Sequence, residues 1–422
     1  MRRTGHATSA ASCVSRDRLE DLVRELGRFG ATDRGGVSRE ALTEADRAAR
    51  RFLVDRARAL GCRVFVDDAA NAFFRRPGRT GANPVGTGSH IDSQPTGGRL
   101  DGAYGVCAGL EVVAALNEAG IETDHPIEVA AWTNEEGSRF APGMMGSAAF
   151  VDPGRLPGFR EVRDRAGVSF GEALDETLAG LPDVPARPLG QPYAAFVEAH
   201  IEQGQVLQDA GAPVGVVTGV QGVRWFEVSV TGQAAHAGTT PRERRRDALA
   251  AATRLLSDTF ALADAGDPSL RLTVGRLDVE PGSPNVVPER VTFTLDVRHP
   301  DEAVLEEVEA AVSLFDAAPV RGCTVQVRRL LEEAPMVFAS TIVGAVRRAV
   351  EEHGYPVVEL LSGAFHDAVH LARHCPTAML FVPSIGGVSH HPAEATDPED
   401  MAAGCRVLAS TLVSLANREV SP

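Results

Sequence analysis

Helical and strand-like patterns alternate along the first part of the chain. Apolar residues recur at helical spacing in 40–60 and 105–118, whereas 84–90 and 126–132 are short apolar runs typical of buried strands. Strands separated by helices usually pair in parallel, because the helix carries the chain back along the sheet. The pattern therefore predicts an α/β domain built on a mostly parallel sheet.

The middle of the chain, 216–330, has a different spacing of apolar residues. Its apolar residues alternate in four strand-like runs and follow a helical period in two intervening segments. One helix is predicted from Pro241 to about residue 263, because Thr240 and Glu243 match a capping box with proline at the first helical position. The order β-α-β-β-α-β is that of a ferredoxin-like α+β module.

The last part of the chain returns to the alternation of its beginning. We therefore interpret 216–330 as an insertion, flanked by 1–215 and 331–422, which together form one catalytic domain. The segment 152–192 is rich in proline and glycine and is expected to be an irregular surface loop. Trp225, in the first strand of the insertion, is expected to be a core residue.

Composition narrows the class of protein. The 422 residues suggest two or three domains, and 44% hydrophobic residues suffice for full cores. The net charge of −15 argues against a general nucleic-acid binder, and no run approaches the roughly 18 apolar residues of a membrane span. Six scattered cysteines without a CxxC pattern favour reduced thiols. We therefore expect a soluble, cytoplasmic protein that binds neither nucleic acid nor membranes.

Residue types that bind metals follow two of the predicted strands. The segment GSHIDSQPTGGRLDGAYGV supplies His90 and Asp101, and TNEEGSRF supplies the adjacent carboxylates Glu135 and Glu136. Open α/β sheets hold ligands at the carboxyl ends of their strands, where these residues fall. Imidazole and carboxylate suit a borderline divalent metal, and a spare carboxylate suits the base that activates water. The combination predicts a metallohydrolase.

Three further residues extend this set. Asp92 is two residues from His90, so in an extended strand both share a face and Asp92 could orient the imidazole. His200 and His390 occur in similar settings, and His390 follows an apolar strand. Taken singly, such a histidine is more often a hydrogen-bonded structural residue, and a Glu pair is more often a solvated turn. The assembly of these residues is what favours a metal site.

Several motifs resemble those of one known family. They are GSHIDSQPTGGRLDGAYGVCAGLEVV, WTNEEGSRFAPGMMGS, VEAHIEQG, VTGQAAHAGTTP, EPGSPNVVP, LDVRHPD, SGAFHDA and PSIGGVSHHPAE. In this order they are similar to the N-carbamoyl-L-amino-acid hydrolase, β-ureidopropionase and allantoate amidohydrolase family. The resemblance covers nearly the whole chain after residue 15. Members of this family are dinuclear-metal hydrolases related to the aminoacylase and carboxypeptidase-type metallopeptidases.

The resemblance implies a ligand set for two divalent ions. The metal of the family is zinc, manganese, cobalt or nickel. Asp101 would bridge the two ions. His90 and His200 would complete one site, and Glu136 with His390 the other. Related peptidases generally have a carboxylate at the position of His200, and the histidine here is similar to the carbamoylase branch.

The resemblance also implies catalytic and substrate-binding residues. Glu135 would be the general base, and His236 would support the developing oxyanion, with a reach across a dimer. Gln203, Asn285 and Arg298 would hold polar groups of the substrate. Arg298 would grip a carboxylate through two parallel hydrogen bonds, which the planar guanidinium favours.

Simpler roles remain open for three of these residues. Arg298 could form an ordinary ion pair with Asp296 or Asp301. Asn285, with prolines close on both sides, could be a turn residue. His236 lies in a loop, where histidines often only cap backbone groups.

Three positions depart from the pattern of the family. Phe365 stands where the family usually has glycine, Ala70 replaces a typical glycine, and His391 replaces a residue that is usually small or amide-bearing. None of them is a metal ligand in the implied set. The departures therefore bear on the identity of the substrate rather than on hydrolysis.

These features predict the hydrolysis of a linear C–N bond in an N-carbamoyl-L-amino acid or β-ureido acid, giving the amino acid, CO2 and NH3. The alternatives among enzymes are an allantoate amidohydrolase and an aminoacylase or dipeptidase. An alternative of another class is a catalytically idle, metal-binding dimeric scaffold, against which Glu135 argues because a structural site needs no spare base. The resemblance further implies that the 216–330 insertion serves as a lid and as the contact of a homodimer.

Overall fold

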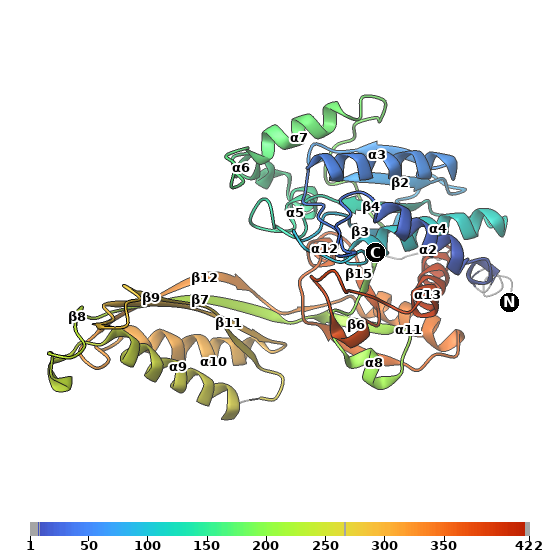
Figure 1. Ribbon diagram of the computed structural model, residues 1–422. Coiled ribbons are helices and arrows are strands. Elements are labelled where there is room, and N and C mark those ends of the chain that lie inside the picture. The colour runs from blue at the N-terminus through green and yellow to red at the C-terminus, as the bar shows by residue number, and fades with distance from the viewer. Residues whose placement is uncertain (1–6, 8, 266, 418–422) are drawn as a thin grey trace. The chain divides into compact units, whose positions relative to one another are not determined.

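The computed structural model describes residues 7, 9–265 and 267–417, and the chain divides into two compact units (Figure 1). The first unit comprises Met1–Thr218 and Phe338–Pro422, and the second is the inserted segment Gly219–Val337. The sequence analysis had put the limits of the insertion at 216–330. Among the described residues, no helix is long and apolar enough to cross a bilayer.

A nine-stranded sheet forms the centre of the first unit. Its strands follow the order β1-β2-β4-β3-β5-β15-β6-β13, and β14 also pairs with β6. The four strands β4, β3, β5 and β15 are parallel, whereas the outer strands are antiparallel, so the predicted α/β class is confirmed with a mixed sheet. The strands are β1 (Arg63–Val66), β2 (Ala72–Arg76), β3 (Val85–His90), β4 (Ile127–Trp132), β5 (Ala195–Ile201), β6 (Gly215–Val220), β13 (Met336–Val337), β14 (Val358–Ser362) and β15 (Thr377–Val382).

Two helices of this unit, α4 and α13, are apolar nearly all round. They pack against each other and against the central strands, which explains why neither has a polar face. The parallel strands are buried along their whole length, so their carboxyl ends are held in fixed positions. The helices are α2 (Arg16–Leu26), α3 (Glu44–Ala59), α4 (Ala103–Glu118), α5 (Met145–Val151), α6 (Leu156–Arg160), α7 (Phe170–Ala179), α8 (Val206–Ala210), α11 (Ser340–Glu352), α12 (Asp367–Leu371) and α13 (Pro398–Ala416).

The segment 152–192 is not the irregular loop that its composition suggested. It contains the helices α6 and α7, and α7 begins with a capping box in which Ser169 and Glu172 each bind the other's backbone. Phe170 and Leu174 are buried against Phe140 and other apolar side chains. The prediction was wrong because proline and glycine were given more weight than the capping signal and the apolar residues that follow it.

The second unit is a four-stranded antiparallel sheet with two helices on one face. The strand order β12-β7-β11-β9 is the fourth, first, third and second in the chain, as expected for the predicted ferredoxin-like module. The helices pack on one face of the sheet and form its core with the strands. The elements are β7 (Gly222–Thr231), α9 (Ala248–Ala265), β9 (Arg271–Glu280), β11 (Arg290–His299), α10 (Glu302–Ser313) and β12 (Thr324–Glu333), with a small pair β8 (Ala235–His236) and β10 (Val286–Val287).

Two details of this unit differ from the predictions. Helix α9 begins at Ala248 and not at Pro241, because the chain makes a short 3-10 turn and becomes extended at Arg245 before the Asp247 carboxylate accepts the Ala250 N–H. Trp225 is 41% exposed rather than part of the core. Alternation along β7 turns its even-numbered residues toward the helices and Trp225 toward the other face.

Ala70 occupies a conformation that favours glycine. Its φ is 56°, in the left-handed region, within the buried turn between β1 and β2. We expect Ala70→Gly to raise the free energy of unfolding by about 0.5–1 kcal/mol, because relief of this strain outweighs the loss of one methyl group. Urea denaturation measures the change. Ala72→Gly, in strand β2, is the matched control and should lower stability; equal losses in both variants would contradict the argument.

Candidate metal centre

Asp101 lies between two groups of side chains that could hold metal ions. Its Oδ1 is 3.1 Å from His200 Nε2 and 3.9 Å from His90 Nε2, whereas its Oδ2 is 3.1 Å from His390 Nε2. Two sets of ligand atoms, each within 4.8 Å of one another, share this carboxylate: His90, Asp101 and His200, and Asp101, Glu136 and His390. One carboxylate with an oxygen turned toward each set is the arrangement required to bridge two ions.

The parallel strands position these side chains. His90 ends β3, His200 is near the end of β5, Asp101 lies between β3 and α4, and Glu136 and His390 are in loops that follow β4 and β15. The sheet therefore collects at one edge residues that are up to 300 positions apart in the chain (His90 to His390). Asp101 precedes α4, and the next residue, Gly102, has φ 63°, where an added Cβ would lie 2.3 Å from His90 Nε2. Only glycine allows this approach.

The two buried imidazoles are oriented by backbone carbonyl groups. His90 Nδ1 is 2.9 Å from the Asp92 carbonyl oxygen, and His200 Nδ1 is 2.9 Å from that of Ile201. With Nδ1 turned to a carbonyl, Nε2 is the nitrogen on the side of Asp101 and is the one that would bind a metal ion. Asp92 thus orients His90 through its main chain; its carboxylate is 3.9 Å from Nδ1 and serves another purpose.

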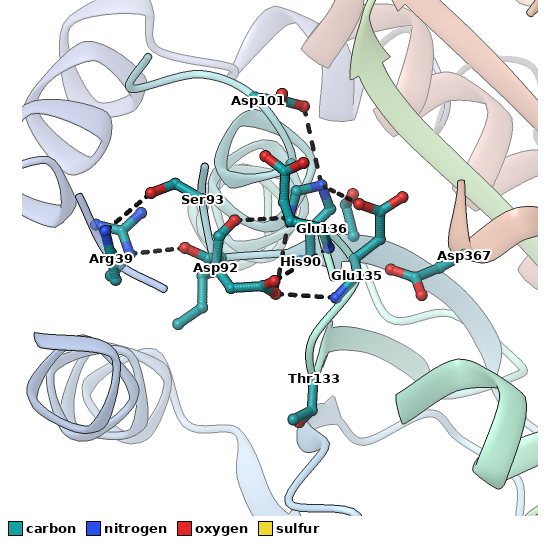
Figure 2. A network of polar contacts seen from close by, with 12 residues as sticks. Arg39, His90, Asp92, Ser93, Asp101, Thr133, Glu135, Glu136 and Asp367 are labelled. Atoms are coloured by element: carbon teal, nitrogen blue, oxygen red, sulfur yellow. Dashed lines mark hydrogen bonds and ion pairs between the residues drawn. The ribbon is translucent and has the colours of Figure 1, made fainter. Parts of the chain in front are cut away.

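The Asp92 carboxylate fixes the adjacent residues Glu135 and Glu136 (Figure 2). It accepts the Glu135 N–H at 3.2 Å and the Glu136 N–H at 3.1 Å. The two side chains then diverge: Glu135 Oε2 lies 3.5 Å from His90 Nε2, and Glu136 Oε2 lies 3.4 Å from His390 Nε2. Gln94 donates to both oxygens of Glu136. Consecutive carboxylates therefore face different parts of the centre.

The crowded charges shift the pKa values of these groups. Burial, together with the nearby charges of Asp367 and Glu136, raises the pKa of Glu135 well above its usual value, and burial raises that of Glu136 to about 8. Burial opposes ionisation of Asp101 as well, but hydrogen bonds from His200 and His390 hold its pKa well below the usual range. Several buried carboxylates in one place are mutually repulsive, and divalent cations would relieve that repulsion. The donor set fits such ions.

Gln203 also lies at this centre. Its Nε2 donates to Asp101 Oδ2 at 3.1 Å and to Ser389 Oγ at 3.0 Å, and its main chain is left-handed, with φ 59°. Its Oε1 is buried and has no hydrogen-bond partner among the described residues. A buried acceptor without a partner is costly in free energy, so this oxygen is suited to receive a donor from a ligand.

Other residues of the centre were missed in the sequence. Glu394 accepts the N–H groups of Leu100 and Asp101 at 2.9 and 3.0 Å, and Glu198 accepts the Ala368 N–H at 2.8 Å. Asp367 lies beside Glu135 (Figure 2). The alternation of strand residues could have identified Glu198, which is two positions before His200 and so on the same face of β5. Glu394 and Asp367 lie in loops or short helices, where no period reveals them.

Three of the predicted site residues belong to the inserted unit. His236 is exposed, and its Nδ1 accepts the Gly238 and Thr239 N–H groups at 3.1 and 3.3 Å, which leaves Nε2 as the protonated nitrogen of the neutral ring. The Asn285 carbonyl accepts the Ala237 N–H, so Asn285 lies next to the β8 strand that carries His236. Both of the simpler roles foreseen for these residues, backbone capping and turn formation, thus occur.

Arg298 already has a carboxylate partner. Its Nε and Nη2 donate to the two oxygens of Asp296, each at 2.9 Å. This is the ion pair foreseen as an alternative to substrate binding. Because the pair is only partly buried, with 28% of each side chain exposed, the guanidinium is both held in a fixed plane and open to solvent.

Two of the three positions that depart from the family pattern, Phe365 and His391, are neighbours in sequence of residues at the centre. Phe365 is half-buried and precedes His366, whose ring packs on that of His200 with centroids 4.4 Å apart. His391 is exposed, and its Nδ1 accepts the Ala393 N–H at 3.1 Å. His391 therefore stabilises the turn that carries His390.

Sequence and structural comparisons agree with this geometry. The sequence profile of Peptidase family M20/M25/M40 matches residues 86–414, so the chain belongs to this family. The family is metal-dependent, in keeping with the clustered ligand residues. The predicted class of enzyme, a hydrolase that acts on C–N bonds, is confirmed.

Relatives of known name extend over almost the whole chain. An N-carbamoyl-L-amino acid amidohydrolase of Geobacillus stearothermophilus is 42% identical, with 96% of this chain and 100% of the relative covered. An allantoate amidohydrolase of Bacillus subtilis (strain 168) is 35% identical, with 94% and 97% covered. The crystal structure of an amidase of the hydantoinase/carbamoylase family from Burkholderia multivorans has a TM-score of 0.89 at 46% identity, with 96% and 98% covered.

Proposed function

We propose that the protein hydrolyses a linear carbamoyl or ureido C–N bond in an N-carbamoyl-L-amino acid or β-ureido acid, with the aid of two divalent metal ions. The observation that carries the proposal is the Asp101 carboxylate shared by two sets of ligands, with Glu135 beside them as a further carboxylate. Names of the relatives, among them N-carbamoyl-L-amino-acid amidohydrolases, support the substrate class. Zinc, manganese, cobalt and nickel all suit this mixture of nitrogen and oxygen donors.

Different residues of the chain carry out different steps of the proposed reaction. Bound divalent ions would supply positive charge that polarises the substrate carbonyl and makes water more acidic. Glu135 takes the proton of the attacking water and passes it to the leaving nitrogen. The resemblance assigns His236 the support of the developing oxyanion, with a reach across a dimer, and Gln203 Oε1 accepts an N–H of the substrate. One water is consumed, and the products are the amino acid, CO2 and NH3.

Two other enzymatic functions use the same centre. An allantoate amidohydrolase is favoured by the relatives of that name, and an aminoacylase or dipeptidase by the wider family. The QPTGG segment that follows Asp92 and Ser93 resembles the carbamoylase or ureidopropionase branch more closely. An idle metal-binding scaffold is disfavoured, because Glu135 is buried at a cost that a structural site would avoid. We further propose a homodimer formed through the inserted unit and a cytoplasmic location.

A hydrolysis screen tests the proposal. The metal-loaded protein is offered N-carbamoyl, N-formyl and N-acetyl amino acids, β-ureidopropionate and allantoate, and release of amine or ammonia is measured. We expect turnover of N-carbamoyl amino acids or β-ureidopropionate to exceed that of the others. Turnover restricted to allantoate or to N-acetyl substrates would replace the proposal with the corresponding alternative.

Arg298 offers a test of how the substrate carboxylate is bound. Arg298→Lys should lower kcat/KM for N-carbamoyl amino acids by about 30-fold, because lysine keeps the charge but loses a planar two-bond contact worth on the order of 2 kcal/mol. With amidated substrates, which lack the carboxylate, the loss should largely vanish. Arg276→Lys is the matched control, because Arg276 lies on β9, the strand next to β11, and forms a partly exposed ion pair with Glu227. An equal loss with acid and amide would make Arg298 structural.

A further inference from the structure

Trp225 is an apolar exception on the open face of the inserted sheet. Its side chain is 41% exposed, whereas its neighbour Phe226 is buried against the helices. The residues that follow it on the same face of β7 are Glu227, Ser229 and Thr231, all polar. An indole left this exposed retains much apolar surface in water, which is unfavourable unless something covers it.

The strand register places Trp225 beside the Arg298–Asp296 ion pair. Trp225 is the direct cross-strand partner of Asp296 on β11 and of Leu331 on β12. Side chains directly opposite each other on one face of an antiparallel pair lie about 5 Å apart at Cβ. Arg298 is two residues further along β11, on the same face as Asp296, to which it donates two hydrogen bonds. An apolar surface thus adjoins an oriented guanidinium.

A shift of strand register on β12 places further apolar side chains next to Trp225. The pairing of β12 with β7 shifts register between Arg329 and Leu331, next to Trp225. Such bulges redirect side chains locally. Leu331 is half-buried and Leu330 is 43% exposed, so aliphatic groups border the indole on the side away from Asp296.

We propose that Trp225, together with Leu331, forms the subsite for the side chain of the substrate and selects N-carbamoyl amino acids with bulky apolar or aromatic side chains. The inference rests on the proposed function, in which Arg298 holds the substrate carboxylate. The α-carbon carries both the carboxylate and the side chain, so a ligand bound to Arg298 has its side chain within a few ångströms of this guanidinium. Trp225 and Leu331 would distinguish one side chain from another, whereas Arg298 treats all α-carboxylates alike.

Kinetics with a bulky and a small substrate test the subsite. For metal-loaded protein, Trp225→Ala should lower kcat/KM for N-carbamoyl-L-phenylalanine by about 10- to 50-fold, mainly through KM, and that for N-carbamoylglycine by less than about threefold. Trp225→Phe should retain most of the preference. Phe260→Ala is the matched control, because Phe260 is 45% exposed on α9, which packs on the opposite face of the sheet. Equal losses with both substrates, or no loss, would overturn the subsite.

Fluorescence gives a readout that does not depend on turnover. The chain has two tryptophans, and Trp132 is fully buried, so quenching by acrylamide reports on Trp225. In Glu135→Gln protein loaded with metal, bound N-carbamoyl-L-phenylalanine should shield Trp225 from acrylamide, and N-carbamoylglycine should shield it much less. Saturating binding without shielding would overturn the subsite while leaving the proposed function intact. Wild-type protein that hydrolyses β-ureidopropionate but neither of these substrates would overturn the subsite alone, and protein that hydrolyses none of the three would overturn the proposed function as well.

Discussion

Glu135→Gln should lower kcat by about three orders of magnitude while leaving metal content unchanged. The amide has nearly the shape of the carboxylate but cannot accept the proton of the attacking water, and a positioned general base contributes about 10²–10⁴ to the rate. The Glu135 main-chain N–H bond to Asp92 does not involve the substituted group, so the loop should keep its conformation. Single-turnover rates and metal analysis on the same preparation measure the two effects separately.

Glu136→Gln is the matched control, because it makes the same chemical change one residue away. Glu136 Oε2 lies 3.4 Å from His390 Nε2 in one of the two ligand sets, and an amide is a far weaker ligand than a carboxylate. Metal content should therefore fall in this variant, and excess metal should restore part of the activity. If Glu135→Gln lost metal and Glu136→Gln kept it without turnover, the two roles would have to be exchanged.

The candidate ligands that the structure brings together could be proposed from the sequence, because most of them stand in short segments at the ends of apolar strands. His90 and Glu136 follow strands that pair in parallel, and parallel strands bring their carboxyl ends together. Residues that support the ligands were harder to predict. Glu394 reaches the Asp101 N–H from a loop almost 300 positions away, and no pattern within either segment predicts that contact (Asp101 to Glu394). Such contacts depend on how loops pack, which a single sequence does not reveal.

The errors in the predicted fold have different causes. The strands and the order of the inserted module were predictable from periods of two and of about 3.6 residues. The predicted start of helix α9 was too early in the chain, because the Thr240 and Glu243 pattern is equally compatible with the 3-10 turn that forms there. Trp225 was expected in the core, although the alternation along β7 places it on the face opposite Phe226. The residue type of Trp225 favoured the core and its position in the alternation favoured the open face, and the position gave the correct prediction.

Removal of metal should abolish activity, and added divalent metal should restore it. Dialysis against a chelator, followed by titration with zinc, manganese, cobalt or nickel, measures both steps. Without cations, the charged neighbours of Glu135, Glu136 and Asp101 are histidines and other carboxylates, among them Asp92 and Asp367, and none of these replaces the Lewis acid that bound ions would supply. Full activity of metal-free protein would contradict the proposed mechanism.

The shared position of Asp101 makes a more specific prediction about the number of ions. Wild-type protein should bind about two ions per chain, because the two sets of ligands are joined by one bridging carboxylate. His200→Ala removes a ligand of one set and His390→Ala a ligand of the other, so each variant should retain about one ion. Asp101→Ala removes a ligand from both sets and should retain neither. A variant of Asp101 that kept one ion at full occupancy would mean that this carboxylate serves a single site, and the bridging arrangement would be wrong.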